Sequence, residues 1–149
     1  MLKRFEQFST VVSGINRYIQ KIERDEMVKY GYKGAFAQYL VVLNKYPQGL
    51  TLTNLCEICD KDKAAVSRAL TELVEKELVF KDIKENKSYK GKYCLTDKGK
   101  ECAEYVVTKA KMAVSKVGSE LSEEQRTVLY SSLEIIAENL KRISQDGLN

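Results

Sequence analysis

Apolar residues near the start of the chain recur at alternating intervals of three and four positions, over nearly three heptads. Such a seam predicts a long amphipathic helix, which can pack either on the core of its own chain or on a helix of a second subunit. The pattern fades around Lys29-Tyr30-Gly31, where the glycine favours a helix end. The seam positions are Phe5, Phe8, Val12, Ile15, Ile19 and Ile22.

Three shorter elements follow this first helix. The spacing of apolar residues predicts a second helix over about residues 34–45, which Pro47 stops. A short extended stretch comes next at residues 50–52. Thr51 or Thr53 can cap a brief third helix, because either hydroxyl can accept a hydrogen bond from a free N–H group of the first turn.

A fourth helix is predicted over about residues 63–77, with Asp62 as its N-cap. Its apolar side carries Val66, Ala69, Leu70, Leu73 and Val74. At about 100° per residue, Ala64, Ser67, Arg68 and Thr71 fall on the opposite side. A solvated helix face usually carries longer Glu and Lys side chains, so this small polar stripe around Arg68 indicates close approach to another molecule.

The pattern then changes to alternation, which predicts two strands joined by residues 84–88 as a hairpin. The tip and the return strand carry a net charge of +3 within residues 84–92, equal to the net charge of the whole segment 31–96. The positive charge of the middle segment is thus concentrated on the hairpin. Its lysines are Lys84, Lys87, Lys90 and Lys92.

Two helices are predicted after the hairpin. Thr96 can cap the first of them, which Gly118 ends, and Ser122 with Gln125 forms a capping box for the second. The last helix carries another seam of alternating spacing, at Leu129, Leu133, Ile136, Leu140 and Ile143. Because both ends of the chain carry heptad-like helices, the pattern favours an intertwined dimer built from the termini.

Composition narrows the possible functions. The 149 residues suit one domain, and they include no histidine and no run of 18 apolar residues. Without histidine there is no Ser-His-Asp or Cys-His nucleophile, and no glycine-rich phosphate loop occurs. We therefore expect no enzyme and no cofactor. The chain start lacks the apolar stretch and cleavage site of a signal peptide, which predicts a cytoplasmic protein.

The four cysteines leave three interpretations open. Cys56 and Cys59 form a C-x-x-C, which with Cys94 and Cys102 could supply four thiolates to zinc, or could sense oxidants. Cys102, however, continues an apolar helical stripe, and the pair at 56 and 59 lies on a short helix. Cysteines that pack as small hydrophobes are the interpretation we favour, with no metal site.

Four strings of residues, in order and at the right spacing, resemble successive signatures of the MarR (multiple antibiotic resistance regulator) family. They are Leu50-Thr51-Leu52-Thr53, Asp62-Lys63-Ala64-Ala65-Val66-Ser67-Arg68, the segment Leu73–Val79, and Leu95-Thr96-Asp97-Lys98-Gly99. Together with the flanking helices, the resemblance covers nearly the whole chain.

The resemblance implies a mainly α (α+β) fold, a winged helix-turn-helix with long N- and C-terminal dimerisation helices. Residues 1–149 would form a single domain of this type, in which residues 31–96 are the DNA-binding lobe and residues 1–30 and 97–149 the dimerisation helices. It further implies a homodimeric transcriptional regulator of double-stranded DNA, commonly a repressor. Release by a small-molecule effector or by thiol oxidation is common in the family.

Carried onto this chain, the resemblance puts the recognition helix in the major groove and the wing at the minor groove or backbone. Arg68 could then pair with guanine O6 and N7; a backbone phosphate or an intramolecular acid are its alternative partners. The predicted DNA-binding residues are Lys63, Ala64, Ser67, Arg68 and Thr71 of the recognition helix and Lys84, Lys87, Lys90 and Lys92 of the wing. The predicted dimerisation residues are Phe5, Phe8, Val12, Ile15, Ile19, Leu133, Ile136, Leu140 and Ile143.

The wing departs from the family pattern. Family wings usually carry Asp-Arg-Arg where this chain has Lys87-Ser88-Tyr89. Lysine binds phosphate as a point charge and lacks the planar fork of arginine, so we expect the wing to add affinity more than sequence preference, unless its tip is merely solvated. A winged-helix module that binds a protein through the same surface is the rival interpretation.

Overall fold

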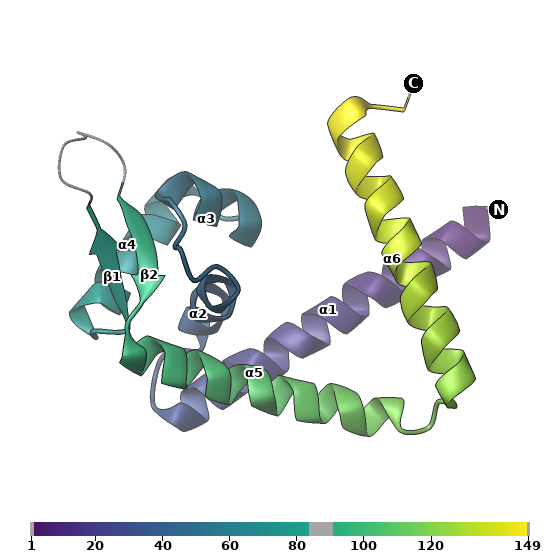
Figure 1. The fold of residues 1–149 in the computed structure, drawn as a ribbon, viewed down its shortest axis with the longest axis horizontal. Helices are drawn as coiled ribbons and strands as arrows, with labels where there is room; N and C mark the ends of the chain where they lie inside the picture. The colour runs from purple at the N-terminus through teal and green to yellow at the C-terminus, as the bar shows by residue number, and fades with distance from the viewer. Residues whose placement is uncertain (1, 84–90, 149) are drawn as a thin grey trace. The chain divides into compact units, whose positions relative to one another are not determined.

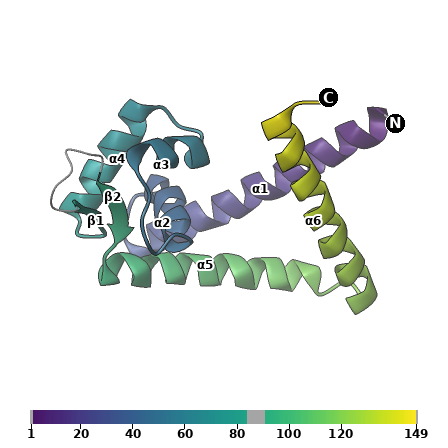
Figure 2. The same ribbon diagram turned by 45° about the horizontal axis from the view of Figure 1, so that its top comes forward.

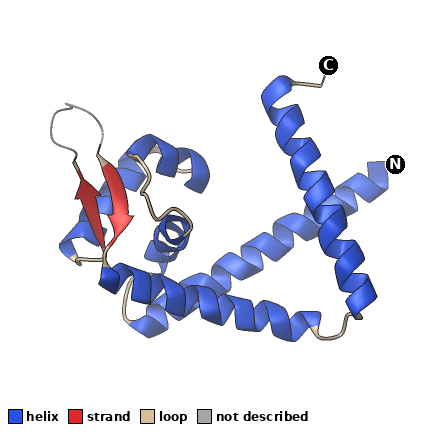
Figure 3. Ribbon diagram, in the orientation of Figure 1, coloured by secondary structure: helices blue, strands red, loops and turns tan. Residues whose placement is uncertain are grey.

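The computed structural model describes residues 2–83 and 91–148. The fold is mainly helical with one small antiparallel sheet, as predicted (Figure 3). The chain divides into two compact units, residues 1–113 and 114–149. The elements are α1 (Leu2–Tyr30), the 3₁₀ helix η1 (Gly34–Phe36), α2 (Ala37–Asn44), α3 (Leu52–Cys59), α4 (Lys63–Glu75), β1 (Val79–Asp82), β2 (Lys92–Leu95), α5 (Asp97–Gly118) and α6 (Glu123–Asp146).

The core of the first unit joins every element from the end of α1 to the first half of α5. Met27 of α1, Leu40 of α2, Leu55 of α3 and Leu73 of α4 are fully buried in one apolar cluster, together with Val106 of α5. Helices α3 and α4 pack against each other, and β1 packs beside α4 (Figures 1 and 2). This core fixes the helix-turn-helix and the hairpin as one body, so their exposed faces have a defined arrangement.

The predicted caps are present. Thr51 accepts a hydrogen bond from the N–H of Asn54, whose side chain in turn accepts from the Thr51 N–H, which completes a capping box. Asp62 accepts from the N–H of Ala65 at 2.8 Å. Ser122 and Gln125 form the reciprocal pair at the start of α6. Each cap satisfies free N–H groups of a first helical turn, which is why these residues begin helices.

Helix α4 ends two residues earlier than the periodicity predicts. Lys76 is its C-cap, and Glu77 has a φ of +59°, in the left-handed region. The Leu78 N–H then reaches back to the carbonyl of Leu73 at 3.0 Å, which closes the end of the helix. Val74, which we placed on the apolar side, is 41% exposed. The buried side of α4 is therefore narrower than predicted. A second difference concerns Leu52, which is the first residue of α3 and does not belong to the extended stretch before it.

The hairpin and α5 meet at a tight junction. The strands pair antiparallel, with Val79 opposite Leu95. Thr96 then donates through its hydroxyl to the Glu77 carbonyl at 2.6 Å and accepts from the Gly99 N–H at 3.0 Å. Gly99 lies so close to Leu78 that a Cβ built on it would meet the Leu78 carbonyl oxygen at 1.9 Å. Thr96 and Gly99 thus fix where α5 begins after the hairpin.

The seams of α1 and α6 leave large apolar side chains in contact with solvent. Phe5 is 64% exposed and Ile15 is 53% exposed. Every described residue of α6 is exposed or half-buried, including Leu140 at 53% exposure. Among the helices of the described residues, none is both long and apolar enough to cross a bilayer.

Candidate nucleic-acid interface

The predicted stripe on α4 is exposed along its whole length. Helix α4 buries Val66, Leu70 and Leu73 on one side. The five predicted recognition residues, Lys63, Ala64, Ser67, Arg68 and Thr71, are all exposed on the other. Because small side chains flank Arg68, a flat or convex partner could approach the helix backbone closely at this face. The helix dimensions fit a major groove about 12 Å wide.

Arg68 is available to a partner. Within the described residues its guanidinium makes no hydrogen bond and no ion pair. The acid one turn further along, Glu72, instead forms an ion pair with Lys33 of the loop before α2. The alternative in which an intramolecular acid holds Arg68 therefore receives no support from the described part of the chain. Thr71 is exposed and donates its hydroxyl to the Ser67 carbonyl at 3.0 Å.

The beginning of α4 is held by the turn that follows α3. Asp60 takes a left-handed conformation with a φ of 50°, and the Lys61 N–H donates to the Cys56 carbonyl at 3.1 Å. Asp62 then caps α4, so that Lys63 is the first residue of the helix. Lys63 is exposed in this first turn, where a lysine side chain and the helix N-terminus both favour an anion such as a backbone phosphate.

Loss of the Asp62 cap should weaken the fold by a modest amount. We expect Asp62→Ala to lower the free energy of unfolding by about 1 kcal/mol, because the Ala65 N–H loses its acceptor. Urea unfolding followed by circular dichroism measures this change, with Asp62→Asn as the variant that keeps a capping oxygen. If Asp62→Ala and Asp62→Asn were both as stable as wild type, the cap would contribute nothing to the free energy of unfolding.

Of the four lysines predicted for the wing, only Lys92 lies among the described residues. Lys84, Lys87 and Lys90 lie outside the described residues. Lys92 is exposed at the start of β2, opposite Asp82 in the register. Sequence reasoning left out Lys81, whose ammonium group lies 5.5 Å from the centre of the Tyr93 ring opposite. The pairing of Lys81 with Tyr93 across the two strands is the feature that could have identified Lys81.

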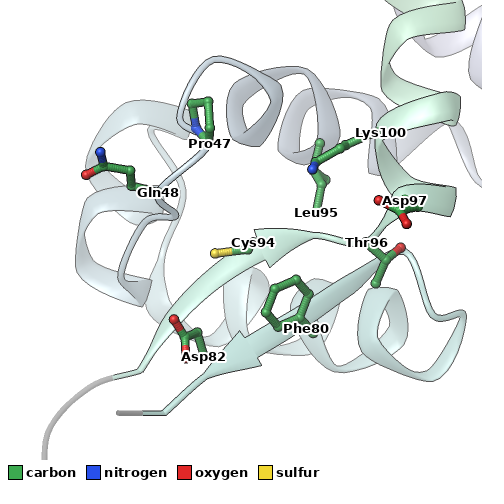
Figure 4. Close-up of a pocket in the computed structure, with 9 residues that line it drawn as sticks. All are labelled: Pro47, Gln48, Phe80, Asp82, Cys94, Leu95, Thr96, Asp97 and Lys100. Carbon is green, nitrogen blue, oxygen red and sulfur yellow. The ribbon is translucent and has the colours of Figure 1, made fainter.

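Two of the open pockets in the described part of the first unit are lined in part by α5. One, of about 380 Å³, lies between Tyr30 of α1 and six residues of α5 that include Tyr105. The other, of about 560 Å³, lies at the base of the hairpin (Figure 4). Its lining residues are Pro47, Gln48, Phe80, Asp82, Cys94, Leu95, Thr96, Asp97 and Lys100.

The tyrosines of α1 and α2 differ in their surroundings. Tyr39 is buried in the core, and Tyr18 is exposed on α1. Tyr30 packs against Tyr105, with ring centres 5.0 Å apart, and lines the pocket between α1 and α5. Tyr105, which the sequence did not single out, also donates its hydroxyl to Glu26 at 3.3 Å.

The cysteines do not gather into a metal centre. Within the described residues, no three His, Cys, Asp or Glu side chains form a group that could hold a metal ion. Cys102 is fully buried and donates its thiol to the Met27 sulfur at 3.5 Å, and burial raises the pKa of the Cys102 thiol to about 11. Cys94 and the pair on α3 are free thiols and only half-buried. Packing is thus the role that the geometry of Cys102 supports.

The sequence matches no protein-family model and no curated protein. Solved structures match the fold along nearly the whole chain. A MarR transcriptional regulator from Methanosarcina mazei Go1 is 26% identical with a TM-score of 0.75, and the match covers 93% of this chain and 92% of that one. A MarR family regulator from Listeria monocytogenes, complexed with a 26mer DNA, is 22% identical with a TM-score of 0.73 over 93% of this chain and 90% of that one.

A Staphylococcus aureus MepR mutant bound to an oligodeoxyribonucleotide is 19% identical, with a TM-score of 0.59 over 89% of this chain and 97% of that one. The helix-turn-helix of α3 and α4 and the hairpin beside it define the class as a winged helix-turn-helix protein. More narrowly, the chain has the fold of the MarR family of transcriptional regulators, and the prediction of that fold from the sequence resemblance is confirmed.

Proposed function

We propose that this protein is a homodimeric transcriptional regulator, a repressor, which binds a pseudo-palindromic site in double-stranded DNA. The observation that carries the proposal is the exposed small-residue stripe of α4 with Arg68 at its centre, whose guanidinium makes no hydrogen bond or ion pair with any described residue. Such a face lets a helix enter the major groove deeply enough for a guanidinium to reach base edges. The DNA-bound structures of the Listeria and Staphylococcus proteins support the proposal by analogy of fold.

Each protomer contributes two kinds of contact. Arg68, Ser67, Thr71 and Ala64 read base edges or methyl groups, and Lys63 binds a phosphate at the start of α4. The wing lysines Lys84, Lys87, Lys90 and Lys92 neutralise phosphates and make affinity depend on salt.

Dimerisation of residues 1–30 with residues 97–149 supplies the second half-site. The support is the exposed apolar seams of α1 and α6, since monomeric proteins rarely leave such continuous apolar faces in water. In a symmetric dimer, two recognition helices about 34 Å apart would meet the major groove one helical turn apart. The predicted contacts are those of Phe5, Phe8, Val12, Ile15, Ile19, Leu133, Ile136, Leu140 and Ile143.

Regulation would act on the separation of the two recognition helices. A small molecule that binds a dimer with the wrong separation more tightly weakens DNA binding by its difference in affinity for the two states. The pocket between Tyr30 and α5 is a candidate site, because it lies between the two segments, residues 1–30 and 97–149, that are proposed to form the dimer.

Fluorescence anisotropy tests the proposal directly. The purified protein is titrated against DNA from upstream of its own gene and against a random duplex, at two salt concentrations. Tight binding to the first with weaker, salt-sensitive binding to the second supports a sequence-specific regulator. Absence of binding to any duplex at low salt would favour the module that binds a protein through α4.

Truncation of the α6 seam should weaken the dimer. We expect Leu133→Ala to raise the dimer dissociation constant roughly tenfold, since about 1.4 kcal/mol of apolar burial would be lost at the interface. Sedimentation velocity over a dilution series measures the constant. Glu138→Ala, on the opposite face of α6, is the matched control and should leave it unchanged. Equal constants for both variants would contradict the predicted interface.

A further inference from the structure

The last turn of α3 holds two thiols on one face. Cys56 and Cys59 are three residues apart in the helix, and Cys59 is its final residue. Side chains with this spacing are neighbours on a helix surface. Both cysteines are half-buried, with one side against the apolar core and the other open to solvent. The pair therefore presents two neighbouring thiols that a small reagent can reach.

The spacing of this pair suits a bridging atom better than a disulfide. In a regular helix, residues three apart have Cβ atoms about 5–6 Å from each other. A disulfide needs a Cβ separation of about 3.5–4.5 Å, so it would close only if the turn were distorted. An atom bonded to both sulfurs spans the longer distance. Thiolates are soft ligands and select soft partners.

The side chains around Cys56 and Cys59 limit which atom can bridge their two sulfurs. No third His, Cys, Asp or Glu side chain joins the pair within the described residues, so a four-coordinate zinc ion would lack protein ligands. An organic arsenic(III) centre needs only two sulfurs, because its own carbon supplies the third bond. Burial and the neighbouring Cys56 thiol also raise the pKa of Cys59.

We propose that Cys56 and Cys59 form a binding site for monosubstituted arsenic(III) compounds. In the reaction, both S–H bonds and the arsenic–oxygen bonds of an arsenic(III) oxide break, and two S–As bonds form. The two thiol protons leave with the oxygen as one water molecule. No atom changes oxidation state, so the step needs no oxidant or reductant.

The position of the site links it to α4. The Cys56 carbonyl accepts from the Lys61 N–H, and Asp60 and Asp62 complete the turn that starts α4. A bridge between the two sulfurs, with its organic group, changes the side-chain positions of the turn that holds these bonds. The arsenical thus loosens the start of α4 and weakens DNA binding; this last step rests on the proposed function.

Intact mass spectrometry with phenylarsine oxide tests the site without DNA. Reduced wild-type protein should gain one phenylarsenic group and lose two hydrogens for each chain. Cys56→Ser and Cys59→Ser should each lose the adduct, whereas Cys94→Ser and Cys102→Ala, the matched controls, should keep it. Circular dichroism verifies that each variant is folded. Retention of the adduct in either variant of the pair, or no adduct with wild type, would overturn the proposal.

Two further measurements test the coupling. Amide hydrogen exchange at Lys61 should accelerate at least tenfold in the adduct, and DNA affinity should fall at least tenfold for wild type but not for Cys56→Ser. Faster exchange without any DNA binding would leave the site intact and overturn only the proposed function. Unchanged exchange and unchanged affinity in the adduct would overturn the coupling.

Discussion

Gly99→Ala is expected to lower the free energy of unfolding by about 3 kcal/mol, at the upper end of the usual cost of overpacking. The backbone of Gly99 is not in the left-handed region, so alanine could adopt its conformation. The space is what alanine lacks, because its Cβ would meet the Leu78 carbonyl oxygen at 1.9 Å. To relieve this overlap, α5 must move away from the hairpin. The Thr96 bonds to Glu77 and to the Gly99 N–H would then lengthen.

Urea unfolding of wild type, Gly99→Ala and Gly118→Ala measures this effect. Gly118 is the matched control, since it also lies in α5 and a Cβ built there meets no atom within 4 Å. Its substitution should be neutral or slightly stabilising, because alanine favours a helix more than glycine does. Equal stability of the two variants would show that the junction tolerates a methyl group and that the close contact of Gly99 with Leu78 does not affect the free energy of unfolding.

The helix boundaries that depend on local chemistry could be predicted from the sequence. Asp62 and Ser122 begin helices because their own side chains reach free N–H groups three residues on, an interaction that needs no distant partner. The order of the helices and the hairpin followed from the same local patterns, and the winged-helix fold followed from the resemblance to the MarR family. The exposure of the α4 stripe also followed, because the apolar residues of that helix left only one side to bury.

The features that the sequence did not reveal depend on residues far apart in the chain. From the sequence, Gly99 is only a residue of low helix propensity in a helix. Its close contact with Leu78 explains why a glycine is needed at this position. The ion pair of Lys33 with Glu72, which leaves Arg68 without that acid, joins residues 39 positions apart. Tyr105 lines a pocket only because α1 lies against α5. Such contacts require the packed core, which a periodicity does not specify.

Replacement of Arg68 should remove sequence preference more than affinity. We expect Arg68→Ala to reduce the preference for the operator over a random duplex by about 1–3 kcal/mol for each half-site, that is by about 5- to 150-fold. The reason is the planar fork of the guanidinium, which can donate to guanine O6 and N7 together, and no other arginine lies on α4. Since Arg68 is exposed and makes no hydrogen bond or ion pair within the described residues, its loss should leave the stability of the fold unchanged.

Two companion variants separate base reading from phosphate binding at the same helix. Arg68→Lys keeps the charge but not the fork, so it should retain the salt dependence of wild type and lose most of the preference for the operator. Lys63→Ala should weaken binding to both duplexes equally and reduce the slope of log affinity against log salt by about 0.9 per protomer, because one phosphate contact is lost. Anisotropy titrations at several salt concentrations measure both quantities. If Arg68→Ala behaved as Lys63→Ala does, Arg68 would bind a phosphate, and sequence preference would have to come from Ser67 and Thr71 or from the shape of the DNA.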